Sequence, residues 1–135
     1  MEKSFITIKE KIQIHQFDPI IYPFKLWVVV GASMDTLKEH FCNLDGTELT
    51  YIITNTVNAF VDYVRNKSNR YIGAVINFET EEQLTIKNIA HESSHAAKYL
   101  FNHIGADTRP HEPFEYIVGW IADCCEQVKL NKFKE

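Results

Sequence analysis

The sequence predicts an α+β domain in which antiparallel strands fill the N-terminal half and two long helices follow. Three observations lead to this prediction. The chain has 135 residues, 45% of them hydrophobic and 24% charged, which suits one domain, residues 1–135, with its own core. Runs rich in β-branched and aromatic residues, separated by turn signals, occupy the first half. After Thr80 the apolar residues recur with a helical period, so strands precede helices.

The first part of the chain is predicted to hold two strands and a short helix. Residues 5–14 alternate in part, with isoleucines recurring on one face, and a following Asp-Pro dipeptide ends this strand. Residues 24–31 are rich in β-forming residues and predict a buried strand. Ser33 is a suitable N-cap for a short helix over residues 34–42.

The middle of the chain is predicted to continue as an antiparallel meander. An Asp-Gly turn within residues 43–46 precedes two strand-like segments, at 50–56 and 59–64. A polar turn at 66–69 leads to a further strand at 70–78. Short turns between consecutive strands favour antiparallel pairing. The 59–64 segment also fits a helix, and the pattern leaves that alternative open.

Two long helices are predicted for the rest of the chain. The first covers about residues 85–104 and ends at Gly105, because glycine readily takes the left-handed conformation that closes a helix. The second runs to about Leu130. Its first helical position suits Pro113, because proline has no backbone N–H to leave unpaired there.

Charge and hydropathy exclude two classes of partner. The net charge is −4, from 14 Lys and Arg against 18 Asp and Glu, and the basic residues are scattered. A nucleic-acid binder usually carries a basic stripe instead. The longest apolar run, residues 26–30, is far too short for a membrane span, and the first ten residues lack the apolar region of a signal peptide. We therefore expect a cytoplasmic protein that binds neither nucleic acid nor membrane.

The three cysteines are predicted to be reduced thiols. Cys42 stands alone, while Cys124 and Cys125 are neighbours, and this odd number is not a disulfide framework. Neighbouring side chains on a helix point about 100° apart, so the pair is poorly placed to share a metal ion. The C-x-x-C spacing of thiol redox enzymes is also missing, so redox chemistry is disfavoured.

The most informative motif is H-E-x-x-H, formed by His91, Glu92 and His95 on the first long helix. The i, i+4 spacing places both imidazoles on one face, one turn apart, where they can share one zinc ion. This face is polar, because the apolar residues of the helix gather on its far side. Glu92 points away from the ligand axis and can reach a metal-bound water. His103, about 12 Å further along the axis, is too far away to join them.

A catalytic zinc site needs a third protein ligand, and the next helix offers two glutamates. Glu112 and Glu115 both lie near its start, where an antiparallel helix pair can bring either one to the metal. Glu112 shares a face with Gly119, which would allow close approach to the histidine helix. Glu115 lies about 60° off that line. Glu112 is therefore favoured as the ligand, and Glu115 remains the alternative.

These motifs resemble the small metallopeptidases of phages and mobile elements, which are similar to minimal gluzincins within the zincins. The resemblance lies in NIAHESSHAA at residues 88–97, in Gly105, and in HEPFEYIVG at residues 111–119. It covers about residues 70–125. It implies a zincin-like fold with a strand before the active helix, and it places the third metal ligand at Glu112.

The sequence therefore predicts a zinc-dependent metallopeptidase. His91, His95 and Glu112 would bind Zn²⁺, which lowers the pKa of a water molecule and polarises the scissile carbonyl. Glu92 would take the proton of that water and pass it to the leaving amine. Tyr116 or else His111 would stabilise the oxyanion.

The predicted substrate is a peptide or protein, and the edge of the strand at residues 71–78 is a possible place for it to pair. The alternative hypothesis is a catalytically inactive zincin-like module that binds a protein partner, with the metal structural or absent. Glu92 argues against that alternative, because a structural site has no use for a base. The oligomeric state is left open.

Overall fold

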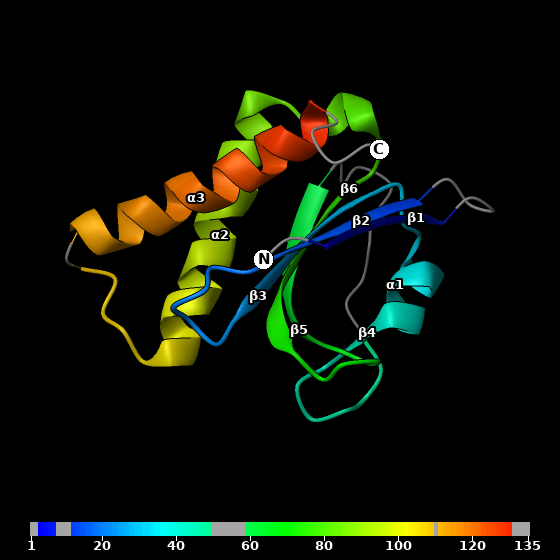
Figure 1. Ribbon diagram of the computed structural model, residues 1–135, viewed down its shortest axis with the longest axis horizontal. Helices are drawn as coiled ribbons and strands as arrows, with labels where there is room; N and C mark the ends of the chain where they lie inside the picture. Colours follow the sequence, from blue (N-terminus) through cyan, green and yellow to red (C-terminus); the bar gives the residue numbers. More distant parts are fainter. Residues whose placement is uncertain (1–2, 8–11, 50–58, 110, 131–135) are drawn as a thin grey trace.

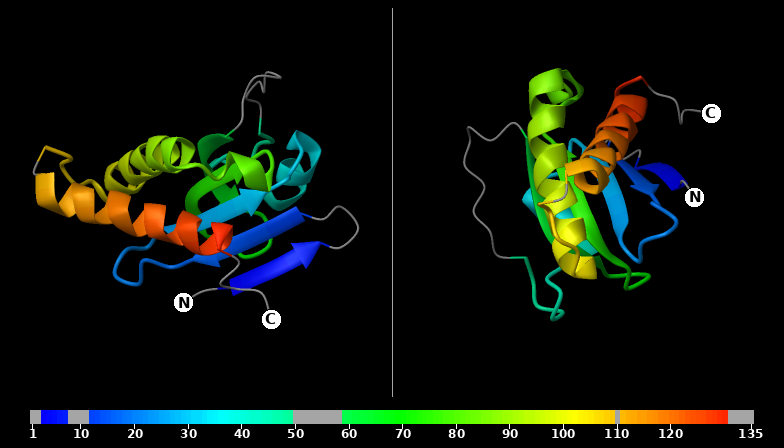
Figure 2. Two further views of the ribbon diagram at one scale, coloured as in Figure 1. Left: turned by 90° about the horizontal axis from the view of Figure 1, so that it is seen from above. Right: turned by 90° about the vertical axis from the view of Figure 1, so that its left-hand side faces the viewer.

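The computed structural model describes residues 3–7, 12–49, 59–109 and 111–130. These residues form an α+β fold, in which one sheet carries helices on both of its faces (Figures 1 and 2). The sequence-based prediction of an α+β class is confirmed. No helix among the described residues combines the length and the apolar character that a membrane span requires.

The strands of the described ranges form one sheet in the order β1-β2-β3-β6-β5-β4. Their bounds are Lys3–Thr7 for β1, Ile12–Phe17 for β2, Lys25–Val30 for β3, Phe41–Cys42 for β4, Ala59–Asn66 for β5 and Ile72–Phe78 for β6. The single strand expected at residues 5–14 is instead two paired strands, β1 and β2. Residues 59–64 are a strand and not a helix. The strand expected at 50–56 lies outside the described residues.

The sheet is mixed, which corrects the prediction of a purely antiparallel one. Four of its neighbouring pairs are antiparallel, but β3 and β6 run parallel, with Lys25 opposite Gly73 and Val30 opposite Phe78. This parallel pair joins two antiparallel parts, β1-β2-β3 and β6-β5-β4, at the centre of the sheet. The first part carries the strands before α1, and the second leads into the long helices.

The α-helices begin and end close to the predicted positions, except that residues 41 and 42, expected at the end of the first helix, form strand β4, and the 3₁₀ turn at 81–83 was not predicted. They are α1 at Met34–His40, the 3₁₀ turn η1 at Glu81–Gln83, α2 at Ile86–Ile104 and α3 at His111–Lys129. Ser33 caps α1 and Thr85 caps α2, each by accepting a backbone N–H three residues on. Gly105 ends α2 at a φ of 72°, as its glycine predicts. The last helix starts at His111, two residues earlier than expected, and Pro113 is tolerated in its first turn.

Two apolar cores lie on the two faces of the sheet. The larger one fills the space beneath α2 and α3, and its buried residues include Phe17, Val28, Ile76, Phe78, Leu100 and Ile121. The smaller one lies on the face that carries α1 (Figure 1) and includes Ile14, Trp27, Val29, Leu37 and Val75. Residues alternate between the two cores along β3 and β6 because successive side chains of a strand point to opposite faces.

Candidate functional site

The H-E-x-x-H segment lies within α2, and its two histidines meet on the exposed side of that helix. The Nε2 atoms of His91 and His95 are 3.3 Å apart, and their rings make an edge-on contact with centroids 4.8 Å apart. In a tetrahedral zinc site with bonds of about 2.0–2.1 Å, two ligand nitrogens lie about 3.3–3.4 Å from each other. The pair therefore has the spacing of two neighbouring ligands of one zinc ion.

Glu92 lies beside this pair but on the buried side of α2. Glu92 is only 7% exposed, whereas both histidines are exposed. Burial raises the pKa of the Glu92 carboxyl, and the positive charge of His91 acts in the opposite direction. A buried carboxylate next to two exposed imidazoles is the arrangement that a positioned proton acceptor needs.

Helix α3 packs antiparallel to α2, as predicted, but its register carries Glu112 away from the histidines. The Phe101 and Phe114 rings are 5.4 Å apart, and the Cys125 thiol interacts with Ser93. Glu112 precedes Phe114 and so lies level with the C-terminal end of α2. That level is roughly 12–18 Å along the axis from His91 and His95.

The two histidines also face away from α3. Ser93 and Phe101, which contact α3, lie at least about 80° around α2 from both histidines. In the parts of the chain that the structure describes, no three His, Cys, Asp or Glu side chains come together as a possible metal site. Glu112 lies in the first turn of α3 and Glu115 just after it, and both are exposed. This arrangement does not bring either glutamate to the pair.

Gly119 does not have the role that its sequence position predicts. A Cβ atom built on Gly119 would meet nothing within 4 Å, and the residue is exposed. The expected close approach to the histidine helix is therefore wrong. The helices instead contact each other through side chains such as Phe101 and Phe114.

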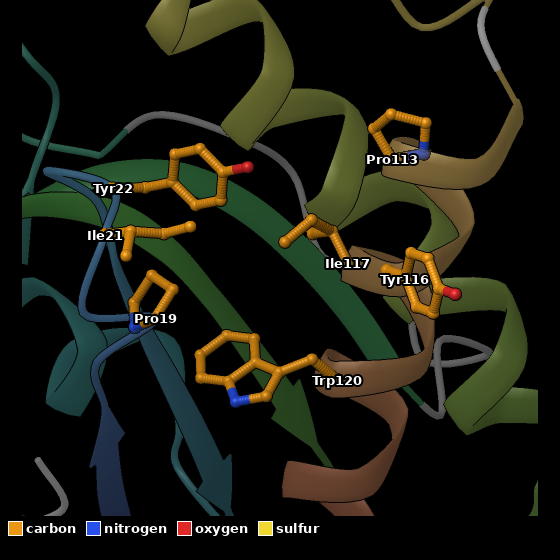
Figure 3. A pocket seen from close by; sticks show the side chains of 7 residues that line it. All are labelled: Pro19, Ile21, Tyr22, Pro113, Tyr116, Ile117 and Trp120. Carbon is orange, nitrogen blue, oxygen red and sulfur yellow. The ribbon is translucent and has the colours of Figure 1, made fainter.

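Tyr116 lines a pocket that none of the H-E-x-x-H residues lines. It is 73% exposed and lies on the turn of α3 that follows Phe114. Together with residues of the β2–β3 loop it lines an apolar pocket of about 320 Å³ (Figure 3), whose walls are Pro19, Ile21, Tyr22, Pro113, Tyr116, Ile117 and Trp120. The side chain of His111, the other predicted oxyanion donor, lies outside the described part of the structure.

An aromatic cluster that sequence reasoning missed lies on the same helix as the histidines. The Tyr99 ring stacks on Tyr63 of β5, with centroids 5.5 Å apart and planes 26° apart. The Tyr63 hydroxyl makes a 2.5 Å hydrogen bond with Nδ1 of His103, and Phe24 packs against both rings. The spacing of Glu92, Tyr99 and His103 places them on one side of α2 and indicates that these side chains lie together. Their contact with Tyr63 of β5 has no signature in the sequence.

Among the described strands, the one near α2 that lacks a partner on one side along part of its length is β5 and not β6. Strand β6 pairs with β3 on one side and with β5 on the other, so the peptide-pairing edge expected at residues 71–78 is wrong. Among the described strands, β4 pairs with only Arg65 and Asn66 of β5. The preceding part of β5, which includes Asp62 and Tyr63, lies beyond that pairing. Burial raises the pKa of Asp62, whose carboxylate accepts the backbone N–H of Tyr63.

Comparison of the chain with protein-family models, with curated proteins and with solved structures finds no match.

Proposed function

We propose that this chain is a zinc-dependent metallopeptidase in which His91 and His95 hold the metal and Glu92 is the general base. One observation carries the proposal. The two imidazole nitrogens stand 3.3 Å apart on an exposed helical face, directly beside a buried carboxylate. The i, i+4 spacing brings the two imidazoles together on the helix, and the buried carboxyl of Glu92 beside them supplies the proton acceptor that a hydrolytic zinc site needs.

The donor set fits zinc in part. The two histidines fit both the ligand type and the separation that zinc requires. A third protein ligand is needed, and none of the described His, Cys, Asp or Glu residues joins the pair. Glu112 remains the predicted third ligand and Glu115 its alternative. Either assignment requires α3 to approach the histidine face of α2 more closely than it does here.

A zinc ion at this pair would supply a water of lowered pKa and a Lewis acid for the scissile carbonyl. The chain's own residues would supply the rest. Glu92 would accept the proton of the attacking water on its carboxylate and return it to the leaving amine. Among the described strands, β4 leaves the part of β5 before Arg65 unpaired on that side. This part contacts α2 through Tyr63 and Tyr99, and an extended peptide would pair with its backbone groups.

A second candidate function is a zincin-like module that binds a protein partner without catalysis. The observation in its favour is that the described residues supply two metal ligands and not three. Such a module would show weak metal binding or none, and Glu92 would have no chemical role.

Zinc content and peptide cleavage separate these two functions. We expect the wild type to take up about one zinc per chain, and His95→Ala to lose it. Lys98→Ala is the matched control, because Lys98 is exposed on the same helix. Glu92→Gln should keep zinc and fold but lose roughly 10²–10⁴-fold in hydrolysis, because an amide cannot accept the proton. A wild type that takes up no zinc, or a Glu92→Gln variant with full activity, would contradict the proposal.

A further inference from the structure

The position of Tyr99 relative to the H-E-x-x-H residues suggests a role in the same site. Tyr99 follows His95 by one turn and Glu92 by two turns. At about 100° per residue it lies about 40° from His95 and about 20° from Glu92 around the helix axis. Helical side chains tilt toward the N-terminus of their helix. The long Tyr99 side chain therefore leans back toward the turn that holds His95 and Glu92.

The electrostatic surroundings of Tyr99 agree with this position. Burial raises the pKa of Tyr99, and the negative charges of Asp62 and Glu92 raise it further. The hydroxyl keeps its proton at neutral pH, so it is a hydrogen-bond donor.

The Tyr99 ring is held while its hydroxyl is free. Its ring is stacked on Tyr63, and the Tyr63 hydroxyl is fixed by His103. Phe24 packs against Tyr63 and His103. Among the hydrogen bonds of the described residues, none involves the Tyr99 hydroxyl, which remains available to a ligand.

We propose that the Tyr99 hydroxyl is the hydrogen-bond donor that stabilises the developing negative charge on the substrate's carbonyl oxygen. This inference rests on the proposed function, and it replaces Tyr116 in that role. No covalent bond forms to Tyr99, and its proton stays on the phenol throughout. Donors placed in advance where charge develops are among the largest contributions to catalysis. Tyr63 and His103 are then positioning residues, which orient the ring without touching the substrate.

The first test measures the binding of a small tetrahedral oxyanion, inorganic phosphate, to the zinc-loaded protein by calorimetry. Tyr99→Phe should keep its zinc and its circular dichroism spectrum but bind phosphate about tenfold more weakly, because one hydrogen bond to an anion is lost. Tyr71→Phe is the control. Tyr71 is a half-exposed tyrosine that contacts Lys25, and its variant should bind as the wild type does.

The second test measures cleavage of labelled casein. Tyr99→Phe should lower kcat by roughly 10²-fold with little change in KM, the signature of a contact made only in the transition state. Tyr63→Phe removes the bond to His103 but not the proposed donor, so its effect should be clearly smaller.

Three results would overturn the role of Tyr99 alone: unchanged phosphate binding and kcat in Tyr99→Phe, an equal loss in Tyr63→Phe, or a loss of kcat in Tyr116→Phe instead. A wild type that takes up no zinc would overturn the proposed function, and the role of Tyr99 with it. The zinc content of the wild type therefore distinguishes the two failures.

Discussion

Ile20 holds a backbone conformation that β-branched residues rarely adopt. Its φ is 70°, in the left-handed region. The turn around it is fixed on both sides, because the Asp18 carboxylate accepts the N–H of Ile20 and the Pro19 carbonyl accepts the N–H of Ile21. The Ile20 side chain is 80% exposed and gains little from burial. The conformation is therefore imposed by the turn and is costly for this residue.

Replacing Ile20 with glycine should stabilise the protein. The left-handed conformation costs an L-residue about 1–2 kcal/mol, and glycine loses about 0.5–1 kcal/mol more backbone entropy on folding. The net expectation for Ile20→Gly is a gain of about 0.5–1 kcal/mol in the free energy of unfolding, measured by urea denaturation. Ile21→Gly is the matched control and should be destabilising, because Ile21 is not among the positive-φ residues and lines the apolar pocket. A less stable Ile20→Gly variant would contradict this reasoning.

The sequence predicts the positions of some residues of the candidate site better than those of others. The His91 and His95 contact follows from helix geometry alone, because i, i+4 side chains meet wherever a helix forms. The position of Glu112 depends on the register between α2 and α3, which is set by contacts such as Phe101 with Phe114. That register has no local signature. Local sequence alone therefore does not determine which residue becomes the third ligand.

At the scale of elements, two glycines show opposite packing. A Cβ atom on Gly73 in β6 would lie 2.0 Å from the carbonyl oxygen of Lys25 in the neighbouring strand β3. A Cβ atom on Gly119 in α3 would meet nothing within 4 Å. The close approach of β3 and β6 therefore requires glycine at position 73, whereas the packing of α3 does not require glycine at position 119.

Alanine at these two positions should change stability in opposite directions. Gly73→Ala forces β3 and β6 apart and should lower the free energy of unfolding by about 1–3 kcal/mol. Gly119→Ala adds a strong helix former at an exposed position and should raise it by up to about 1 kcal/mol. Chemical denaturation of both variants beside the wild type is the measurement. The packing described for Gly119 would be refuted if its alanine variant were destabilised as much as that of Gly73.

The positions of the strands along the chain are easier to predict than the partners with which they pair. Strands β3 and β6 were expected at 24–31 and 70–78 and are observed at Lys25–Val30 and Ile72–Phe78, because buried β-forming runs identify strands locally. Their parallel pairing was not expected. Short turns favour pairing between consecutive strands. Strand β3 instead pairs with β6, and α1, β4 and β5 lie between them along the chain.

For the molecule as a whole, His15 links stability to pH. It is 5% exposed on β2, with its Nε2 3.2 Å from the Gln13 side-chain oxygen. Burial lowers the pKa of His15 below its ordinary value of 6.5. The unfolded chain therefore takes up a proton at a higher pH than the folded chain does. Stability contributed by neutral His15 is present above about pH 6.5 and is lost as the pH falls through the folded pKa.

We expect the free energy of unfolding to fall between about pH 7.5 and about pH 5.5, and the fall to be smaller in His15→Gln. Glutamine keeps a polar side chain but cannot be protonated in this range. Urea denaturation of both proteins at the two pH values measures the difference. An equal fall in both would show that other groups carry the pH dependence.

The parallel seam between β3 and β6 also has a consequence for how the chain folds. Each antiparallel part of the sheet contains neighbours that are close in sequence and can pair early, such as β2 with β3 and β5 with β6. The seam joins Lys25 to Gly73, so a long stretch of chain must close before its first hydrogen bond forms. Closure of this seam is therefore expected to limit the folding rate. Once it is closed, the backbone amides of both strands lie at the centre of the sheet and should exchange with solvent only when the whole domain unfolds.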